Sequence, residues 1–433
     1  MQVQAGNIAR APQGNAPPLP GAPAIHDDHR VTTTHPAAID EASLRYPGWR
    51  VVLACYLAAV WCWGFGLYGH GVYLTELHRL HGWPTALISG AITGFYLLTA
   101  ALVVFVSDAI TRLGPRLVML IGACCFGSAV ALLAVIAELW QLYLTYLLMA
   151  VGAASMHVGA ITNVVGLWFD RQRSLALSLA LNGASSGGIL VTPVLVLAIA
   201  HYGFSNTIIG SSVVIAVILL PAIALWIDRP VAAATTPDTA PTAAAWTRRS
   251  ALRSTKFWSV AAPFAMGLTA QVGFLVHQIA ILQPTIGRTQ AGFSVAALTV
   301  AAIVGRFGLG AFAKRLDMRR FTAWSLVSQA AALLATAATA NTTALIVACV
   351  VFGLSAGNLL TLPSLVIQRE FDAPSFGMLV GLSWAISQFT YAFGPGLLGI
   401  VRDVTGGYAA ALGICVALEL GAAALILLRP AAR

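Results

Sequence analysis

The sequence predicts an all-α integral membrane protein whose twelve membrane-spanning helices form two related bundles of six. Its composition, the spacing of its apolar stretches and an internal repeat carry this prediction. Of 433 residues, 58% are hydrophobic and 9% are charged, whereas soluble domains have about 25% charged residues. The composition therefore excludes a soluble enzyme, a coiled coil and a nucleic-acid-binding protein.

Apolar stretches of membrane-spanning length recur along the chain. A hydrocarbon core about 30 Å thick needs roughly 20 apolar residues per helix. Stretches that meet this length lie at 50–73, 86–107, 117–137, 140–165, 175–200, 206–227, 257–282, 292–312, 321–340, 343–367, 376–401 and 406–428. A long polar break follows the sixth stretch, so we expect a bundle over 46–228, a cytoplasmic linker over 229–256 and a second bundle over 257–429.

Residues 1–45 differ from the rest, with many Pro, Ala, Asp and His residues and no apolar block behind a basic start. They predict a disordered cytoplasmic tail and no cleavable signal peptide, because they cannot bury enough apolar surface to fold. A polar cluster in this tail could bind a metal, although a solvated run is the simpler interpretation. Its members are His26, Asp27, Asp28, His29 and His35. All six cysteines fall inside apolar stretches, so we expect no metal site, no cofactor and no disulfide framework.

The cationic residues predict the orientation, because short loops rich in Lys and Arg stay in the cytoplasm. Twenty of the 24 Lys and Arg residues lie in the tail, the linker, the C-terminal end and the loops on that side. The opposite loops contain three, Arg79, Arg288 and Arg402, and Arg306 lies within the eighth stretch. Both termini are therefore expected in the cytoplasm, and the net charge of +9 needs no nucleic-acid partner.

An internal repeat relates the two halves. Equivalent residues recur at a nearly constant separation of 202 or 203 residues. The pairs are 169–170 with 371–372, Pro193 with Pro395, and 112–116 with 315–319. Transporters are commonly built from such repeats, and the two prolines are candidates for bends that gate a pathway.

The basic loop after the second stretch contains Arg112, Gly114 and Arg116, with Asp108 one helical turn earlier. With this loop and the repeat, residues 49–428 resemble the major facilitator superfamily, whose G-x-x-x-D-R-x-G-R signature occupies this place. A Thr stands where the superfamily has its Asp, and Asp108 is the candidate substitute. The resemblance implies a secondary transporter, and no enzyme, in which this loop has a conformational role during alternating access.

Three further stretches carry a narrower resemblance. They are 48–52 with Tyr68 and 71–73, then 168–173 with Ala176, Ala180 and Gly183, and finally 394–396 with Asp403 and 405–406. These stretches are similar to the monocarboxylate-transporter and oxalate/formate-antiporter branch of that superfamily. The similarity implies a monocarboxylate-like substrate, an Arg in the eighth helix and a His in the seventh. Arg306 and His277 occupy these two places.

Arg306 is the deepest cation, eight residues before Lys314 and hence on the order of 12 Å into the membrane by helix rise. Its planar guanidinium could hold a substrate carboxylate, or it could reach back to the cytoplasmic face or brace a loop. Ala302 stands where the branch has an Asp, and Ser387 and Gln388 where its dicarboxylate carriers have a Lys. One deep cation favours a monoanion over a dianion, whose second charge would be buried without a partner.

Other polar side chains within the spans are candidate contacts, since buried polar groups in a membrane usually point into the bundle or a wet cavity. Each could equally be a packing contact. The substrate candidates besides Arg306 and His277 are Gln278, Tyr68, His70, Asn182, Trp384, Gln388, Tyr391 and Asn358. Proton coupling would fall to His277, His70 or His157. No acidic residue is expected in the cavity, because Glu419 lies in the last helix, which usually faces lipid in this fold.

We therefore expect a transporter of a small organic monoanion, with proton coupling, exchange and facilitated diffusion all open. The alternative in the same fold is efflux of a larger hydrophobic or neutral compound, which the Trp-rich first helix favours. A membrane sensor or a membrane enzyme is disfavoured, since no output domain and no catalytic motif stands out. The Arg-rich, Lys-poor composition suggests a bacterial inner membrane, with substrate and lipid as partners of a monomeric chain.

Overall fold

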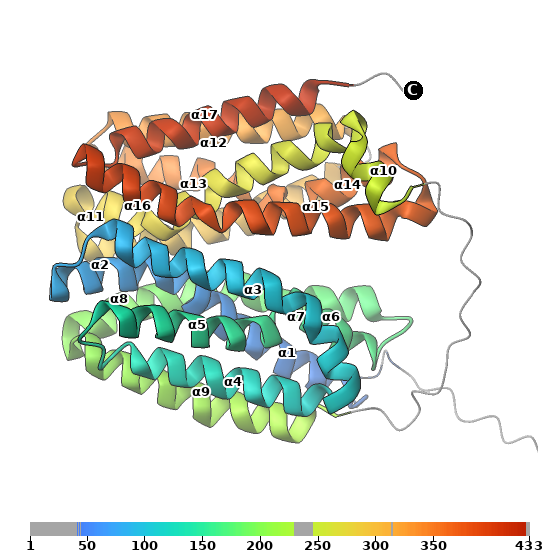
Figure 1. Ribbon diagram of the computed structural model, residues 1–433, viewed down its shortest axis with the longest axis horizontal. Coiled ribbons are helices and arrows are strands. Elements are labelled where there is room, and N and C mark those ends of the chain that lie inside the picture. Colours follow the sequence, from blue (N-terminus) through green and yellow to red (C-terminus); the bar gives the residue numbers. More distant parts are fainter. Residues whose placement is uncertain (1–40, 42, 44, 229–245, 313–314, 430–433) are drawn as a thin grey trace, which may run out of the picture. The chain divides into compact units, whose positions relative to one another are not determined.

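The computed structural model describes residues 41, 43, 45–228, 246–312 and 315–429. The histidines and aspartates of the predicted tail, with most of the tail and of the predicted linker, lie outside the described residues. The described secondary structure is helical and contains no strand (Figure 1). The prediction of an all-α protein is confirmed.

The N-terminal half contains six membrane-crossing segments. They are α1 (Gly48–Trp63) with η1 (Gly64–Tyr68) and α2 (Gly69–His81); α3 (Thr85–Leu113); α4 (Pro115–Leu132); α5 (Leu139–Met156) with α6 (Val158–Gly166); α7 (Arg173–Ser186) with η2 (Gly187–Val191) and α8 (Thr192–Tyr202); and α9 (Phe204–Trp226). Here η1 and η2 are π-helical turns inside the first and fifth segments. Pro193 is the second residue of α8, two residues after the end of η2, at the joint between two parts of one segment.

A short helix, α10 (Arg248–Arg253), lies in the predicted linker and precedes the C-terminal half. The elements of that half are α11 (Thr255–Phe312), α12 (Met318–Ala338), α13 (Thr342–Leu359), α14 (Leu362–Glu370), η4 (Ala373–Ser375), α15 (Phe376–Tyr391), α16 (Phe393–Thr405) and α17 (Ala409–Leu427). Pro395 lies near the start of α16, again at a joint between two helices.

Ten helical stretches of the described chain are long and apolar enough to cross a membrane. One of them, Thr255–Leu309, has 55 residues and holds two spans, because Gly287 has a φ of 77° and turns the chain. A further span is shared by α15 and α16, which have 16 and 13 residues and meet at Ala392. Neither reaches the span length alone, and together they supply the eleventh predicted helix.

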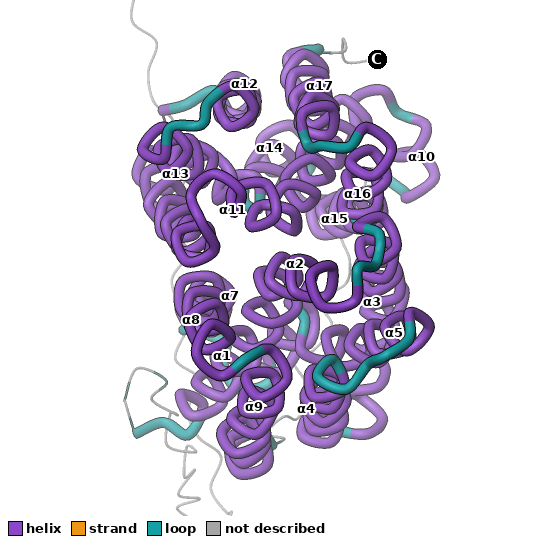
Figure 2. The backbone as a smooth tube through the Cα atoms, turned by 90° about the vertical axis from the view of Figure 1, so that its left-hand side faces the viewer, coloured by secondary structure: helices purple, strands orange, loops and turns teal. Residues whose placement is uncertain are grey.

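The helices fall into two groups when viewed from one end, with α1 to α9 in one and α11 to α17 in the other (Figure 2). Small residues allow close contact within each group. A methyl group at Gly183 of α7 would overlap the backbone carbonyl of Tyr56 in α1, and one at Gly305 of α11 would overlap that of Leu354 in α13. Close backbone approach at small residues is the usual way in which membrane helices pack.

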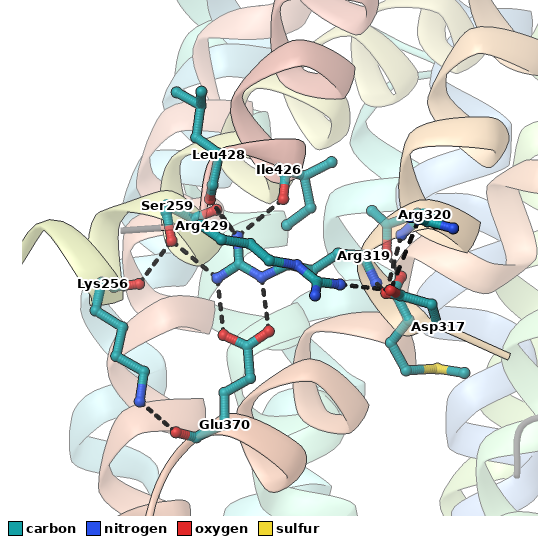
Figure 3. A network of polar contacts seen from close by, with 11 residues as sticks. Lys256, Ser259, Asp317, Arg319, Arg320, Glu370, Ile426, Leu428 and Arg429 are labelled. Atoms are coloured by element: carbon teal, nitrogen blue, oxygen red, sulfur yellow. Dashed lines mark hydrogen bonds and ion pairs between the residues drawn. The ribbon is translucent and has the colours of Figure 1, made fainter. Parts of the chain in front are cut away.

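Equivalent arginines bind the end of the last helix in each half. Arg116 Nε donates to the carbonyl of Ile227, after α9, at 2.7 Å. Arg319, which lies 203 residues later, donates to two backbone carbonyls at the end of α17 at 2.8 Å each and pairs with the carboxylate of Glu370 (Figure 3). Helix C-termini carry unpaired carbonyls with partial negative charge, which suits a cation. The two halves that the sequence repeat relates thus also share an equivalent contact, from an arginine to the carbonyls at the end of the last helix.

The predicted conformational loop joins α3 to α4. Gly114 has a φ of 90°, which favours glycine, and Pro115 then begins α4. Asp108 and Arg112 are exposed on the last turns of α3. Arg116 is the residue of this loop that reaches the end of α9.

Asp317 caps α12 in the equivalent loop of the C-terminal half. Its carboxylate accepts hydrogen bonds from the backbone N–H groups of Arg319 and Arg320 at 3.0 and 3.3 Å and pairs with Arg429 (Figure 3). Burial raises the pKa of Asp317, but the hydrogen bonds from Arg429 and from the two N–H groups outweigh it, so the pKa lies below its ordinary value. Folding therefore favours the ionised form of the Asp317 side chain.

Candidate substrate site between the two halves

The two π-helical turns, η1 and η2, pack against each other. A Cβ at Gly187 would stand 2.7 Å from the backbone nitrogen of Gly64, so a larger residue does not fit. Their contact brings Tyr68, at the end of η1, next to Gly188 of η2, where a Cβ would stand 2.8 Å from the Tyr68 ring and 2.7 Å from Thr299 Oγ1 of α11. π-Helical turns are rare and occur frequently at functional sites.

Arg306 lies on α11 seven residues beyond Thr299 and interacts electrostatically with Tyr68. The arginine is half-buried, and its Nε donates to the carbonyl of Gly357 over 3.3 Å. No carboxylate of the described chain pairs with Arg306, in contrast to Arg319. The two Nη groups of Arg306 make no hydrogen bond with the described residues and can bind an anion.

The fourth and tenth membrane segments are interrupted at equivalent places. His157 separates α5 from α6 with an extended backbone, φ −70° and ψ 170°, and its ring stacks on Trp63 at 5.3 Å. Asn358 comes 201 residues later, at the end of α13, and its Nδ2 donates to the carbonyl of Leu354 at 3.1 Å. Broken helices are common where transporters bind substrates, so these two positions join Tyr68 and Arg306 as site candidates.

Trp384, Gln388 and Tyr391 lie on α15 and are half-buried. The ring of Tyr391 contacts that of Tyr96 in α3, with centroids 5.6 Å apart, and thereby links the two halves. Trp384 packs against the apolar core of the C-terminal half. Asn182 is exposed on α7. The structure therefore brings Tyr391 to the junction of the halves and gives Trp384 a packing contact.

His70 is fully enclosed within the N-terminal half. Four aromatic rings surround it, with centroids at 4.9 Å for Phe95, 5.3 Å for Tyr146, 5.7 Å for Tyr96 and 6.3 Å for Tyr73. Both ring nitrogens of His70 and the hydroxyls of the three tyrosines have no hydrogen-bond partner among the described residues. A buried polar group left unpaired costs about 1–3 kcal/mol, so such a concentration of them calls for an explanation.

His277 joins the halves near the opposite end from Arg319. Its Nε2 lies 3.0 Å from the carbonyl of Pro395 and 3.3 Å from Ser89 Oγ, and its Nδ1 lies 3.0 Å from the hydroxyl of Tyr408. Ser89 belongs to α3 of the N-terminal half, whereas Pro395 and Tyr408 belong to the C-terminal half. His277 is therefore placed to respond to the separation of the halves.

Charged contacts between the halves gather at the same end. The carboxylate of Glu76 in α2, 1% exposed, pairs with Arg288 of α11 at 2.6 Å and with Arg79 of its own helix at 3.0 Å. From the other half, Asp403 of α16 accepts a hydrogen bond of 2.6 Å from the backbone N–H of Ala86, in the first turn of α3. A carboxylate at a helix N-terminus is stabilised by the helix dipole. Each half thus contributes one carboxylate that binds the other half.

Two polar residues point into the C-terminal half. Gln278 is fully buried, and its Nε2 donates to Ser294 Oγ at 3.0 Å. Glu419 is also fully buried, and the expectation that it faces lipid is wrong. Its helix α17 packs against both α11 and α12, and a Cβ at Gly267 of α11 would stand 3.5 Å from Glu419 Oε2. Because α17 is apolar on every side, its sequence contains no stripe that marks the inner face.

Sequence reasoning missed several residues that the structure brings to these contacts. Thr299, Tyr96 and Tyr146 look like ordinary span residues, although the rule that selected His70, a polar group inside a span, applies to each of them. For Glu76 the sequence offers a second indication of a role in contacts, because Arg79 lies one helical turn later, at the spacing of an ion pair.

A membrane protein built from two repeated halves that meet around broken helices has the architecture of a secondary transporter. Residues 52–395 match the Major Facilitator Superfamily. The chain belongs to that family and is a multi-pass membrane transporter.

Several known proteins resemble the chain over most of its length. Uncharacterized MFS-type transporter YcxA of Bacillus subtilis is 24% identical over 365 residues, which cover 80% of this chain and 86% of that protein. Monocarboxylate transporter 13 of Rattus norvegicus is 24% identical over 391 residues, which cover 88% and 89%. A bacterial homolog to the human lysosomal transporter Spinster, in an inward-facing and unoccupied conformation, shares the fold with a TM-score of 0.70 and 15% identity, covering 89% of this chain and 97% of that one.

Proposed function

We propose that the protein transports a small organic monoanion and that Arg306 holds its carboxylate. The observation that carries this proposal is a half-buried guanidinium that lies near Tyr68 of η1, donates one hydrogen bond to the carbonyl of Gly357 and has no acidic partner among the described residues. A free guanidinium fork matches the two oxygens of a carboxylate. The similarity to a protein named monocarboxylate transporter 13 supports the same substrate class.

The transport cycle is alternating access around this site. Glu76, Asp403 and His277 hold the halves together at one end of the helices, opposite to the end where Arg116 and Arg319 lie. We place the termini and the two arginines in the cytoplasm of a bacterial inner membrane, following the distribution of Lys and Arg. The structure then corresponds to a state closed on the external side, as in the inward-facing structure that shares its fold.

The test is transport by purified protein in liposomes of verified orientation. Uptake of radiolabelled pyruvate, lactate and benzoate is compared for the wild type, Arg306→Ala and Arg306→Lys. We expect saturable uptake by the wild type and at least tenfold less by Arg306→Ala, because a hydrogen bond to a charged group is worth about 1.5–3 kcal/mol. Arg306→Lys should retain part of the activity, since its ammonium keeps the charge without the planar fork.

The matched control is Arg249→Ala, which removes an exposed arginine from α10. It should transport like the wild type. Equal uptake by Arg306→Ala and the wild type would show that Arg306 does not bind the substrate and has a structural role instead. If the wild type moves none of the three acids, the proposal fails, and efflux of a larger hydrophobic or neutral compound becomes the function to test.

A further inference from the structure

The enclosure around His70 contains more unpaired polar atoms than packing requires. His70, Tyr73, Tyr96 and Tyr146 come from α2, α3 and α5, and each has a polar atom without a partner in the described part of the chain. Phe or Leu side chains would fill the same space and leave nothing unpaired. The residue types therefore point to a ligand that pairs with imidazole nitrogens and phenol oxygens.

We propose that His70 binds the proton that is transported with the substrate and that the three tyrosines form its cage. The polar groups that face His70 are the hydroxyls of Tyr73 in α2, Tyr96 in α3 and Tyr146 in α5, and no described charged group lies against it. This enclosed state suits the neutral imidazole. A protonated ring would donate its two N–H groups to phenol oxygens and gain cation–π contacts from the surrounding rings.

The cage lies where the opening of the halves can uncover it. Tyr96 contacts His70 on one side and Tyr391 of the C-terminal half on the other, at centroid distances of 5.7 and 5.6 Å. The same helix, α3, carries Ser89 and Ala86, which bind the C-terminal half at the closed end. When these contacts break, α3 separates from α15, and Tyr96 loses the ring that covers it. Protons can then reach His70 from the side of the membrane at which Ser89 and Ala86 lie, which is closed in this structure.

Binding of the proton and binding of the substrate would each favour the other. This coupling rests on the proposed function. His70 follows Tyr68 by two residues, and Tyr68 lies near both Arg306 and Tyr96. A carboxylate at Arg306 and an imidazolium at His70 attract each other, so each raises the affinity for the other by the same factor. One proton and one monoanion together carry no net charge across the membrane.

The experiment compares two measurements on one preparation in liposomes. The first is accumulation of labelled pyruvate, lactate or benzoate driven by an inward proton gradient. The second is exchange of labelled for unlabelled acid at equal pH, which needs no net proton movement. For His70→Gln we expect the ratio of accumulation to exchange to fall at least tenfold from the wild-type ratio.

Two further variants keep the result interpretable. His201→Gln removes an exposed histidine from α8 and should keep the wild-type ratio. The double variant Tyr96→Phe with Tyr146→Phe keeps both rings and removes two hydroxyls, and it should lower the ratio. If His70→Gln is not recovered as folded protein, this double variant decides the question.

The outcomes separate the proton site from the transport function. A wild type that exchanges acids without responding to the gradient overturns the proton site and leaves the proposed function intact. A His70→Gln protein with the wild-type ratio also overturns it, as does one that loses both activities in equal proportion. A wild type that exchanges none of the acids overturns the proposed function, and the proton site with it.

Discussion

Glu419 is enclosed by its own half, and neither carboxylate oxygen has a partner in the described residues. An ionised carboxylate would be far more costly there than a neutral one, so we infer that Glu419 is in its uncharged acid form. Gln329 of α12 is also fully buried, with both amide atoms unpaired among the described residues, and α12 packs on α17.

Replacing Glu419 by Gln should leave stability nearly unchanged, because the amide has the size and neutrality of the acid. Glu419→Ala should lower the free energy of unfolding by about 2 kcal/mol, the lower end of the range for large-to-small changes in a core. Thermal unfolding of the purified variants in detergent checks both. A Gln variant as unstable as the Ala variant would mean that the carboxylate is ionised and paired.

The candidate site could be predicted from the sequence only as far as residue type and depth allow. Arg306 stood out because a cation inside a span is costly wherever it points. The inward direction of Glu419 and the enclosure of His70 depend on which face of a helix meets its neighbours. Helices that are apolar all round do not encode that face in their pattern.

At the scale of elements, the loop before α12 is organised by Asp317. The carboxylate pairs with two N–H groups of the first turn, which have no partner within the helix. It also pairs with Arg429 beyond the end of α17, so the cap of one helix is joined to the end of another.

Removing this cap with Asp317→Ala should lower the free energy of unfolding at pH 7 by about 1 kcal/mol. The folded-state pKa of Asp317 lies below its ordinary value of 3.8. A lowered carboxylate pKa stabilises the fold above the ordinary value, and this contribution is lost as the pH falls through the folded-state pKa. Unfolding in detergent at pH 7 and at acid pH should therefore show a difference from the wild type that shrinks on acidification. Asp108→Ala, at an exposed site on α3, should show no such convergence.

The lengths and number of the membrane segments could be predicted, because the thickness of the hydrocarbon core fixes how many apolar residues each needs. The interruptions inside them could not. The π-helical turns at Gly64–Tyr68 and Gly187–Val191 and the break at His157 change the local hydrogen bonding while the composition stays apolar. Tertiary contacts, such as the meeting of Gly64 with Gly187, are needed to stabilise them.

At the scale of the whole molecule, the two halves are held together at one end by reciprocal carboxylates. Glu76 is nearly fully buried and pairs with Arg288, while the carboxylate of Asp403 accepts a hydrogen bond from the backbone N–H of Ala86. Removing one partner of a buried ion pair leaves the other charge without compensation. The closed state should therefore lose more stability than the open state, in which these groups meet water.

Glu76→Gln should raise the population of the state in which the halves are open at this end on the order of tenfold, as expected for a coupling of 1–3 kcal/mol. Hydrogen–deuterium exchange at 76–86 and 283–290 should quicken accordingly. Glu138→Gln, at the same end but confined to the cap of α5, is the matched control and should leave exchange in these segments unchanged. Equal exchange in Glu76→Gln and the wild type would contradict a role for this pair in closing the halves.

Arg288 and Arg306 lie on one stretch of α11 after its turn at Gly287, without a further break between them. They are 18 residues apart, which is five full turns at 3.6 residues per turn and roughly 27 Å of rise, so both point from the same face. Arg288 pairs with Glu76 of the N-terminal half, and Arg306 is the residue that we propose to bind the substrate carboxylate. Because no loop separates the two arginines, we expect an anion that binds at the proposed Arg306 site to shift the position of Arg288 and thereby to change the contact with Glu76.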